Sequence, residues 1–175
     1  MAMDGIEPDT KDWTWVLDRP CEQCGFDPAQ VPAQEVAAAL MAAVPRWRAA
    51  LGRPDAQVRP APGTWSTTEY AAHVRDVCRV FDERLRLMLT AENPLFENWD
   101  QDRTAVDDGY ADQAPERVAE ELAAAAASFA VHLDTVPDDA WERPGRRSNG
   151  SVFTVDTLSR YFLHDLVHHL HDVGA

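Results

Sequence analysis

Two histidines near the C-terminal end of the chain have the spacing of a metal-binding pair. His164 and His168 are four residues apart in a segment with helical periodicity, so both imidazoles should lie on one face of a helix, one turn apart. His73 belongs to a different expected helix. Two histidines from one helix and one from another would supply three ligands and leave a coordination position open for water or substrate. One interpretation of the spacing is therefore a metal site formed by His73, His164 and His168.

A second interpretation of these histidines needs no metal. The helix dipole favours positive charge in the last turn of a helix, and His169 and His171 fit that placement well. A histidine beside an apolar stripe, as His73 is beside Tyr70 and Val77, is commonly a hydrogen-bonded core residue. Spacing alone leaves both interpretations open.

The chemistry of such a site depends on what occupies the open position. Neutral imidazole binds zinc, nickel, iron and copper, so the residues alone do not select the ion. On zinc the pKa of a bound water can fall to about 7, and the metal can instead bind a thiolate. Asp165, Asp172 and Asp76 are nearby carboxylates that could orient a ligand histidine through its second ring nitrogen. The alternative for each is a solvated charge on a helix surface.

A Cys-x-x-Cys pair near the N-terminus has three interpretations. Cys21 and Cys24 could be half of a zinc knuckle, a redox pair, or a plain turn with free thiols. The redox interpretation usually needs a strand followed by a helix, whereas a loop is expected here. A structural zinc would need two further ligands, for which Cys78, His132 or His171 would have to come near.

Four segments with apolar residues at spacings of three and four must position these side chains. An all-α fold, a four-helix bundle with long loops between its helices, is therefore expected. A long acidic loop over residues 93–113 is expected to cover a pocket. The helices are expected over about 34–52, from Ser66 to before Asn93, from Pro115 to about Leu133, and over about 154–172.

The length of 175 residues fits one bundle with an extension rather than two separate domains. Residues 1–33 contain several Trp, Pro and Cys residues without a regular period. We expect them to form an irregular N-terminal arm packed on the body, while residues 34–175 form the metal-binding bundle. Exposed aromatic residues in this arm would suit a homodimer.

The net charge of −14 limits the partners of the protein. Such an acidic surface repels phosphate backbones and anionic lipids, so we expect neither nucleic-acid nor membrane binding. No apolar run approaches the length of about 18 residues that a membrane helix needs, and the N-terminus lacks a signal-peptide pattern. We therefore expect a cytoplasmic protein.

Taken together, the motifs resemble the DinB-like superfamily, and in particular its branch of mycothiol-dependent maleylpyruvate isomerase and related thiol S-transferases. The resemblance covers roughly residues 34–172. It is carried by Gly63-Thr64-Trp65-Ser66 leading into a helix with Glu69 and His73, and by Phe153-Thr154-Val155 opening a last helix that carries His164, Asp165, His168 and His169.

This resemblance implies a four-helix bundle that holds a divalent metal by three side chains, often three histidines. Carried over by position, the ligands are His73, His164 and His168. In the isomerase the first ligand of the last helix is acidic, and His164 departs from that pattern. The implied cofactor is a divalent transition metal, with zinc expected first and nickel or iron as alternatives.

The implied activity is that of a metal-dependent thiol S-transferase or isomerase. The metal would present a thiolate, with mycothiol as the candidate co-substrate, to a small electrophile. Two alternatives stay open. One is a metal-dependent hydrolase that uses a metal-bound water, and the other is a non-catalytic metal-binding or stress-response module.

Overall fold

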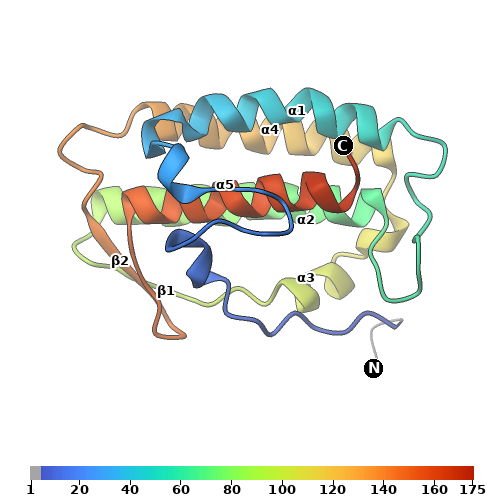
Figure 1. Ribbon diagram of the computed structural model, residues 1–175, viewed down its shortest axis with the longest axis horizontal. Coiled ribbons are helices and arrows are strands. Elements are labelled where there is room, and N and C mark those ends of the chain that lie inside the picture. The colour runs from blue at the N-terminus through green and yellow to red at the C-terminus, as the bar shows by residue number, and fades with distance from the viewer. Residues whose placement is uncertain (1–4) are drawn as a thin grey trace.

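Four long helices run alongside one another and form the body of the molecule (Figure 1). They are α1 (Val36–Leu51), α2 (Thr67–Thr90), α4 (Pro115–Asp134) and α5 (Val155–Asp172). The computed structural model describes residues 5–175, so residues 1–4 of the predicted arm lie outside the described range. The four bounds agree closely with the helices expected from periodicity and confirm the predicted four-helix bundle.

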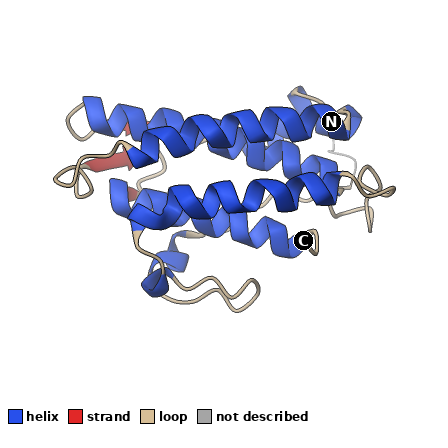
Figure 2. Ribbon diagram, turned by 90° about the horizontal axis from the view of Figure 1, so that it is seen from above, coloured by secondary structure: helices blue, strands red, loops and turns tan. Residues whose placement is uncertain are grey.

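The helices do not follow one another around the bundle. Both α1 and α2 pack chiefly against α4 and α5, and they contact each other only sparsely. The helices α1 and α2 therefore occupy diagonal corners of the bundle, as do α4 and α5, whereas α2 and α4 lie side by side (Figures 1 and 2). The connection between α1 and α2 crosses the end of the bundle, which places α2 beside α5 and brings the histidines of these two helices together.

Local capping explains where the two histidine-bearing helices begin. At the start of α2, the Glu69 backbone N–H donates to Ser66 Oγ at 3.2 Å, and the Ser66 N–H donates to Glu69 Oε2 at 2.8 Å. This capping box satisfies two backbone donors that the first turn leaves free. Thr154 and Thr157 form an equivalent box at the start of α5. Both caps are encoded locally, so the first turns of α2 and α5 are fixed by a few neighbouring residues.

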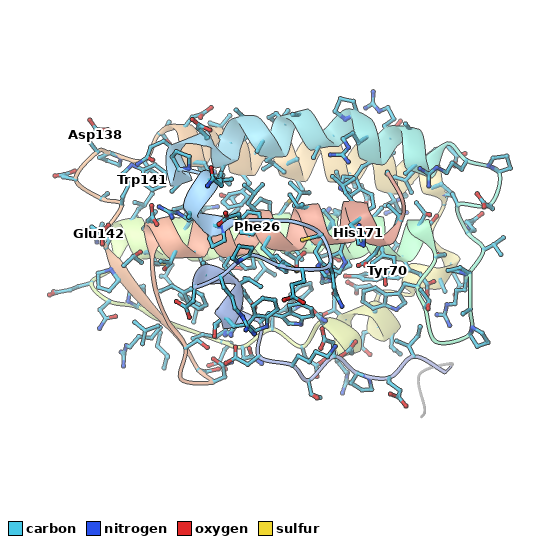
Figure 3. All side chains as sticks on the ribbon, viewed as in Figure 1. Phe26, Tyr70, Asp138, Trp141, Glu142 and His171 are labelled. Carbon is cyan, nitrogen blue, oxygen red and sulfur yellow. The ribbon has the colours of Figure 1, made fainter. Side chains whose placement is uncertain are left out.

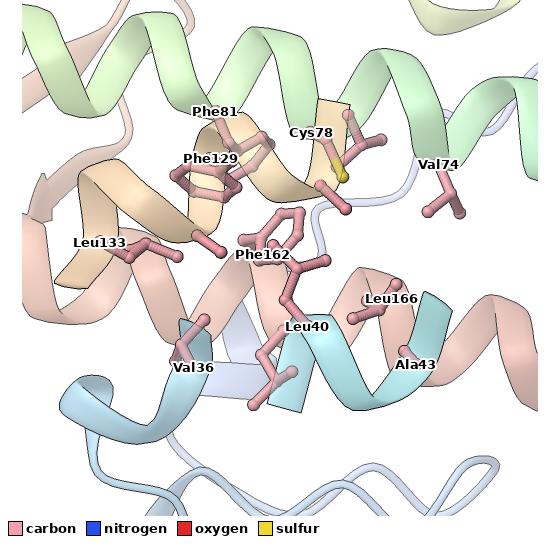
Figure 4. Packing of buried hydrophobic residues seen from close by; sticks show 14 of the residues in the cluster. Val36, Leu40, Ala43, Val74, Cys78, Phe81, Phe129, Leu133, Phe162 and Leu166 are labelled. Carbon is pink, nitrogen blue, oxygen red and sulfur yellow. The ribbon is translucent and has the colours of Figure 1, made fainter. Parts of the chain in front are cut away.

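The core lies between the four helices and is largely aliphatic and aromatic (Figure 4). The Phe129 and Phe162 rings meet edge to face with centroids 4.7 Å apart, and Phe81 lies 5.7 Å from Phe162. Helices from three parts of the chain thus meet at Phe162. Among residues 5–175, no helix combines the length and the apolar character that crossing a membrane requires.

The long connection over residues 93–113 is more structured than the loop expected from the sequence. It contains the short strand β1 (Leu95–Phe96), the helix α3 (Gln101–Asp107) and a 3-10 turn over Tyr110–Asp112. Asp100 caps α3 by accepting the Arg103 N–H at 2.9 Å, a local signal that can begin even a short helix. The strands β2 (Pro144–Arg147) and β3 (Val152–Thr154) form a hairpin, and β1 pairs in parallel with β2.

The described part of the N-terminal arm packs along α5 (Figure 1). It contains three 3-10 turns, η1 (Thr14–Leu17), η2 (Pro28–Gln30) and η3 (Ala33–Glu35). Val16, Cys21 and Phe26 are buried, and Arg160 of α5 donates from Nη1 to the Pro28 carbonyl oxygen at 3.1 Å. Apolar burial and this hydrogen bond hold the arm against the face of α5 that carries histidines.

Candidate metal centres

The structure divides the predicted trio of histidines between two clusters of metal-ligating side chains. In each cluster, one ligand atom from every residue lies within 4.8 Å of the others. The His–Asp cluster consists of His73, Asp165 and His169, and the Cys–His cluster consists of Cys21, Cys24, His164 and His168. His73 is therefore not grouped with the two histidines with which the sequence analysis placed it.

The division follows from the geometry of an α-helix. Successive residues are rotated by about 100° around the helix axis, so His164 and His168 form one stripe on α5, while Asp165 and His169 form the next. Only the second stripe reaches His73 on α2. The missed signal was present in the sequence, because Asp165 and His169 have the same four-residue spacing and begin with the acidic residue of the isomerase pattern.

In the His–Asp cluster, unpaired polar atoms point at one another across short distances. His73 Nε2 lies 3.6 Å from Asp165 Oδ1, and His169 Nε2 lies 3.7 Å from the same oxygen. Within residues 5–175, both ring nitrogens of His73 and this Asp165 oxygen are buried without a hydrogen-bond partner. Buried polar atoms normally have partners. A divalent cation among them would bind one ligand atom from each of the three residues, so the donor set fits a metal.

Asp172 orients the third residue of this cluster. His169 Nδ1 lies 2.8 Å from Asp172 Oδ2. A carboxylate only accepts hydrogen bonds, so the histidine donates through Nδ1. That tautomer leaves the Nε2 lone pair free, on the side facing Asp165. In metal sites, a carboxylate commonly accepts a hydrogen bond from the second ring nitrogen of a ligand histidine. Asp172 makes this interaction with His169.

The electrostatics of the cluster favour a positive charge at its centre. Burial raises the pKa of Asp165, but the His169 and His73 imidazoles outweigh it and lower this pKa to about 2. Burial also disfavours a charged His169, yet Asp165 and Asp172 raise its pKa above the ordinary histidine value. The ionised Asp165 would be balanced by a bound divalent cation.

Asp76, a candidate orienting residue in the sequence analysis, is engaged elsewhere. Its carboxylate accepts hydrogen bonds from Arg75 at 2.9 Å, from Arg79 at 2.8 Å and from Tyr110 Oη at 2.6 Å. Burial raises the pKa of Asp76, but Arg75 and Tyr110 bring it below the usual range. The structure therefore places Asp76 in an ion-pair network that ties α2 to the connection before α4. Of the other two candidates, Asp172 accepts a hydrogen bond from His169, and Asp165 is itself one of the possible ligands of the His–Asp cluster.

Aromatic rings enclose the His73 side of the cluster. The Trp99 indole stacks on the His73 imidazole, with centroids 5.5 Å apart and planes inclined by 6°. The Trp65 ring lies 5.4 Å from His73, and the Tyr70 ring lies 5.1 Å from His169. Trp99 belongs to the acidic connection over residues 93–113, and its indole ring covers one face of the His73 imidazole.

A cavity of about 260 Å³ opens beside His169 and is lined mainly by polar side chains. Among the described residues that line this cavity, four are aspartate or glutamate, and Lys11 is the single lysine or arginine. A smaller hollow of about 80 Å³ borders both clusters. The acidic lining residues of the larger cavity are Glu7, Asp9, Asp102 and Asp172.

The Cys–His cluster lies on the other stripe of α5, against the arm. Cys21 Sγ lies 3.7 Å from His168 Nδ1. Burial raises the pKa of the Cys24 thiol to about 11, in the opposite direction from the lowered pKa of a redox-active cysteine. Burial and the neighbouring His168 lower the pKa of His164 to about 4, which leaves this imidazole neutral and able to act as a metal ligand.

The partners suggested by the sequence for the two cysteines are placed elsewhere. Cys78 is buried in the core between the helices (Figure 4). His132 Nδ1 lies 2.6 Å from Asp82 Oδ1. The two histidines that the fold brings near Cys21 and Cys24 are instead His164 and His168.

The four-helix bundle and the histidine–carboxylate cluster between α2 and α5 define a candidate metal-binding protein. The DinB superfamily matches residues 51–173, and the chain belongs to this superfamily.

The fold is also similar to that of YfiT from Bacillus subtilis, with a TM-score of 0.71 and 18% sequence identity over 89% of this chain and 91% of that chain. YfiT is described as a probable metal-dependent hydrolase with an unusual four-helix bundle topology. At this identity the likeness supports the fold alone. No curated protein matches the chain.

Proposed function

We propose that the protein is a metal-dependent enzyme in which His73, Asp165 and His169 hold a divalent transition metal. The observation that carries this proposal is the convergence of buried, unpartnered ring and carboxylate atoms from α2 and α5. Three such ligands leave a coordination position open, as in catalytic rather than structural sites. This assignment replaces His164 and His168 of the sequence-based trio with their neighbours on α5.

Two imidazoles and one carboxylate suit zinc, and they also suit iron(II) or nickel. Zinc stays the first expectation. When bound, the metal would lower the pKa of a thiol or a water at the open position and so supply a nucleophile at neutral pH.

The chain's own residues prepare the site for this chemistry. Asp172 holds His169 in the tautomer that leaves Nε2 free. Trp99 and Trp65 cover His73 and exclude water from that side. The 260 Å³ cavity beside His169 leaves room for a substrate.

We favour a thiol as the nucleophile, and thus an S-transferase acting on a small electrophile. A cavity of this size with polar walls can hold a low-molecular-weight thiol, with mycothiol as the candidate, whereas a water molecule needs far less room. The acidic lining favours a neutral or cationic electrophile over a dicarboxylate. This preference argues against isomerisation of maleylpyruvate, which is a dianion.

Hydrolysis is the second candidate. Asp102 lines the cavity, and burial raises its pKa above that of an ordinary aspartate. A carboxylate of raised pKa is a better general base toward water. The description of YfiT as a probable metal-dependent hydrolase points in the same direction.

One assay separates these functions. Metal-loaded protein is mixed with the neutral electrophile 1-chloro-2,4-dinitrobenzene with and without mycothiol, cysteine or glutathione, and separately with 4-nitrophenyl acetate without thiol. The S-transferase proposal predicts conjugation that requires both thiol and metal. Ester cleavage that is independent of thiol would favour the hydrolase. Metal binding without either reaction would favour a non-catalytic module.

Two variants give the assay its control. His73→Ala should abolish turnover and metal binding at the His–Asp cluster. His171→Ala changes an exposed histidine of α5 that belongs to neither cluster (Figure 3), and it should leave turnover unchanged. Equal activity in the two variants would contradict the assignment of the His–Asp cluster as the active site.

A further inference from the structure

We propose that the Cys–His cluster is a second, structural zinc site, which fastens the N-terminal arm to α5. It uses none of the three ligands assigned to the His–Asp cluster, so it stands independently of the enzymatic proposal. Two cysteines and two histidines are a typical donor set of closed, tetrahedral zinc sites. The four ligands are Cys21 and Cys24 from the arm, and His164 and His168 from α5.

The distances between the donors suit one small ion. Zinc binds sulfur at about 2.3 Å and nitrogen at about 2.0 Å, so a sulfur and a nitrogen of one tetrahedral site lie about 3.5 Å apart. Cys21 Sγ and His168 Nδ1 are separated by 3.7 Å. All four donors fall within 4.8 Å of one another. Small side-chain rotations would therefore complete the tetrahedron without a change in the backbone.

The arm presents its two sulfurs from a tight turn. The Gly25 N–H donates to the Cys21 carbonyl oxygen at 2.8 Å, and the Cys21 N–H donates to the Phe26 carbonyl oxygen at 2.8 Å. Gly25 has a φ of +76°, a conformation that favours glycine. The turn brings Cys21 and Cys24 to the same histidine pair, as a zinc knuckle requires.

The histidine side of the cluster contains a polar atom that the protein leaves unsatisfied. His164 Nε2 is buried and has no hydrogen-bond partner among the described residues, and the whole residue is 4% exposed. Phe26 and Trp13 pack against the His164 ring with centroids 5.6 Å away. A buried imidazole nitrogen between apolar rings is costly unless a ligand engages it. A bound metal would account for this placement.

The site has the closed character of a structural centre. Its four ligands fill the coordination of zinc, so no position is left for a substrate. Trp13 also packs against His168, with centroids 5.2 Å apart. Asp172 Oδ1 lies 3.8 Å from His168 Nε2 and can support that ligand from behind.

Fastening the arm has a consequence for the neighbouring cavity. Gln23 lies between the two cysteines, and it forms part of the cavity wall beside His169 together with Asp9, Lys11 and Trp13 of the same arm. A zinc at the Cys–His cluster would fix that wall against α5, and its loss would leave the wall free to open.

Cobalt(II) substitution tests the proposal, because only a site with thiolate ligands gives intense sulfur-to-cobalt charge-transfer absorption in the near ultraviolet. Full-length protein is purified under reducing conditions, and its metal content is measured by elemental analysis and native mass spectrometry. The wild type should bind two equivalents and show the charge-transfer band. The double variant Cys21→Ser, Cys24→Ser should lose the band and one equivalent while its helical circular dichroism is unchanged.

Matched variants assign the band to the cluster. Cys78→Ala removes the remaining cysteine of the chain and should keep the band. His73→Ala should lose the other equivalent and also keep the band, so a failure of the enzymatic proposal can be told apart from a failure of this one. Should the double variant misfold, Cys24→Ser alone changes the less buried cysteine, and it should weaken the band because it removes one of the two sulfur ligands.

Limited proteolysis gives a second readout that does not depend on activity. Removal of zinc from the Cys–His cluster should speed cleavage within the arm several-fold and leave the bundle intact. The proposal is overturned if the reduced, zinc-soaked protein shows no thiolate band, if the band persists in the double variant, or if both cysteines are held in a disulfide that excludes metal.

Discussion

The Nδ1 atom of His169 lies 2.8 Å from Oδ2 of Asp172, three residues further along α5. The other oxygen of this carboxylate lies 3.8 Å from Nε2 of His168. One side chain thus faces a histidine of each cluster. Asp172 belongs to neither ligand set, and its two carboxylate oxygens face one histidine of each set.

The Asp172→Ala variant removes the hydrogen-bond acceptor that fixes the His169 tautomer. Loss of such a supporting carboxylate typically weakens metal binding about 10- to 100-fold. We expect that loss at the His–Asp cluster, measured by competition with a chelator, and unchanged helical circular dichroism. The control is Asp138→Ala, at an exposed position in the loop before β2 (Figure 3). Equal metal affinities in the Asp172→Ala and Asp138→Ala variants would show that Asp172 does not support the metal site.

The Trp99→Leu variant takes away the ring that stacks on His73. An aliphatic side chain covers the imidazole less well, so water and chelators should reach the ligand more easily. We expect metal release to a chelator to be several-fold faster in stopped-flow measurements, with little change in the number of metals bound. The Trp99→Phe variant retains an aromatic ring, and its rate of metal release should lie between those of Trp99→Leu and the wild type. Identical release rates for all three proteins would show that the indole does not cover the site.

Tyr110→Phe tests the structural assignment of Asp76. The variant removes a buried hydrogen bond of 2.6 Å to an ionised carboxylate, which should lower the free energy of unfolding by about 1.5–3 kcal/mol. Metal affinity should stay the same, since Asp76 is paired with Arg75 and Arg79 and not with a ligand histidine. Denaturant unfolding and chelator competition measure the two quantities. Weaker metal binding would restore Asp76 as an orienting residue.

The Glu69→Gln variant tests how the start of α2 depends on pH. Burial raises the pKa of Glu69, but hydrogen bonds from Arg59 and Ser66 outweigh it, so the pKa lies below its usual value of 4.5. A carboxyl whose pKa is lowered by folding stabilises the native state above its unfolded pKa, and this contribution is lost as the pH falls through the folded pKa.

The metal-free variant should therefore unfold more easily at pH 7, by about 1.5–3 kcal/mol. Its difference from the metal-free wild type should shrink as the pH falls below about 4.5. Urea unfolding at several pH values, with a chelator present throughout, measures this difference. A difference that did not depend on pH would show that the glutamate acts through packing and not through its charge.

Much of the fold could be predicted because its signals are local. The stripes of apolar residues predict the four long helices, and the capping pattern from Ser66 to Glu69 predicts where α2 begins, since each depends on neighbours within one or two turns. The short helix α3 was not predicted, because its seven residues carry too little periodicity to distinguish them from a loop.

The sequence by itself determined that α5 carries two adjacent pairs of potential ligands at four-residue spacing, and that α2 carries His73. It did not determine which pair meets His73, because the two stripes differ by one residue, or a rotation of about 100° about the helix axis. That rotation is set by the packing of buried α5 residues such as Phe162 and Leu166 against the other helices. Only the tertiary structure therefore decided that Asp165 and His169 face His73 on α2. It also decided that His164 and His168 lie beside the cysteines of the arm, because the arm reaches α5 through contacts between residues far apart in the chain.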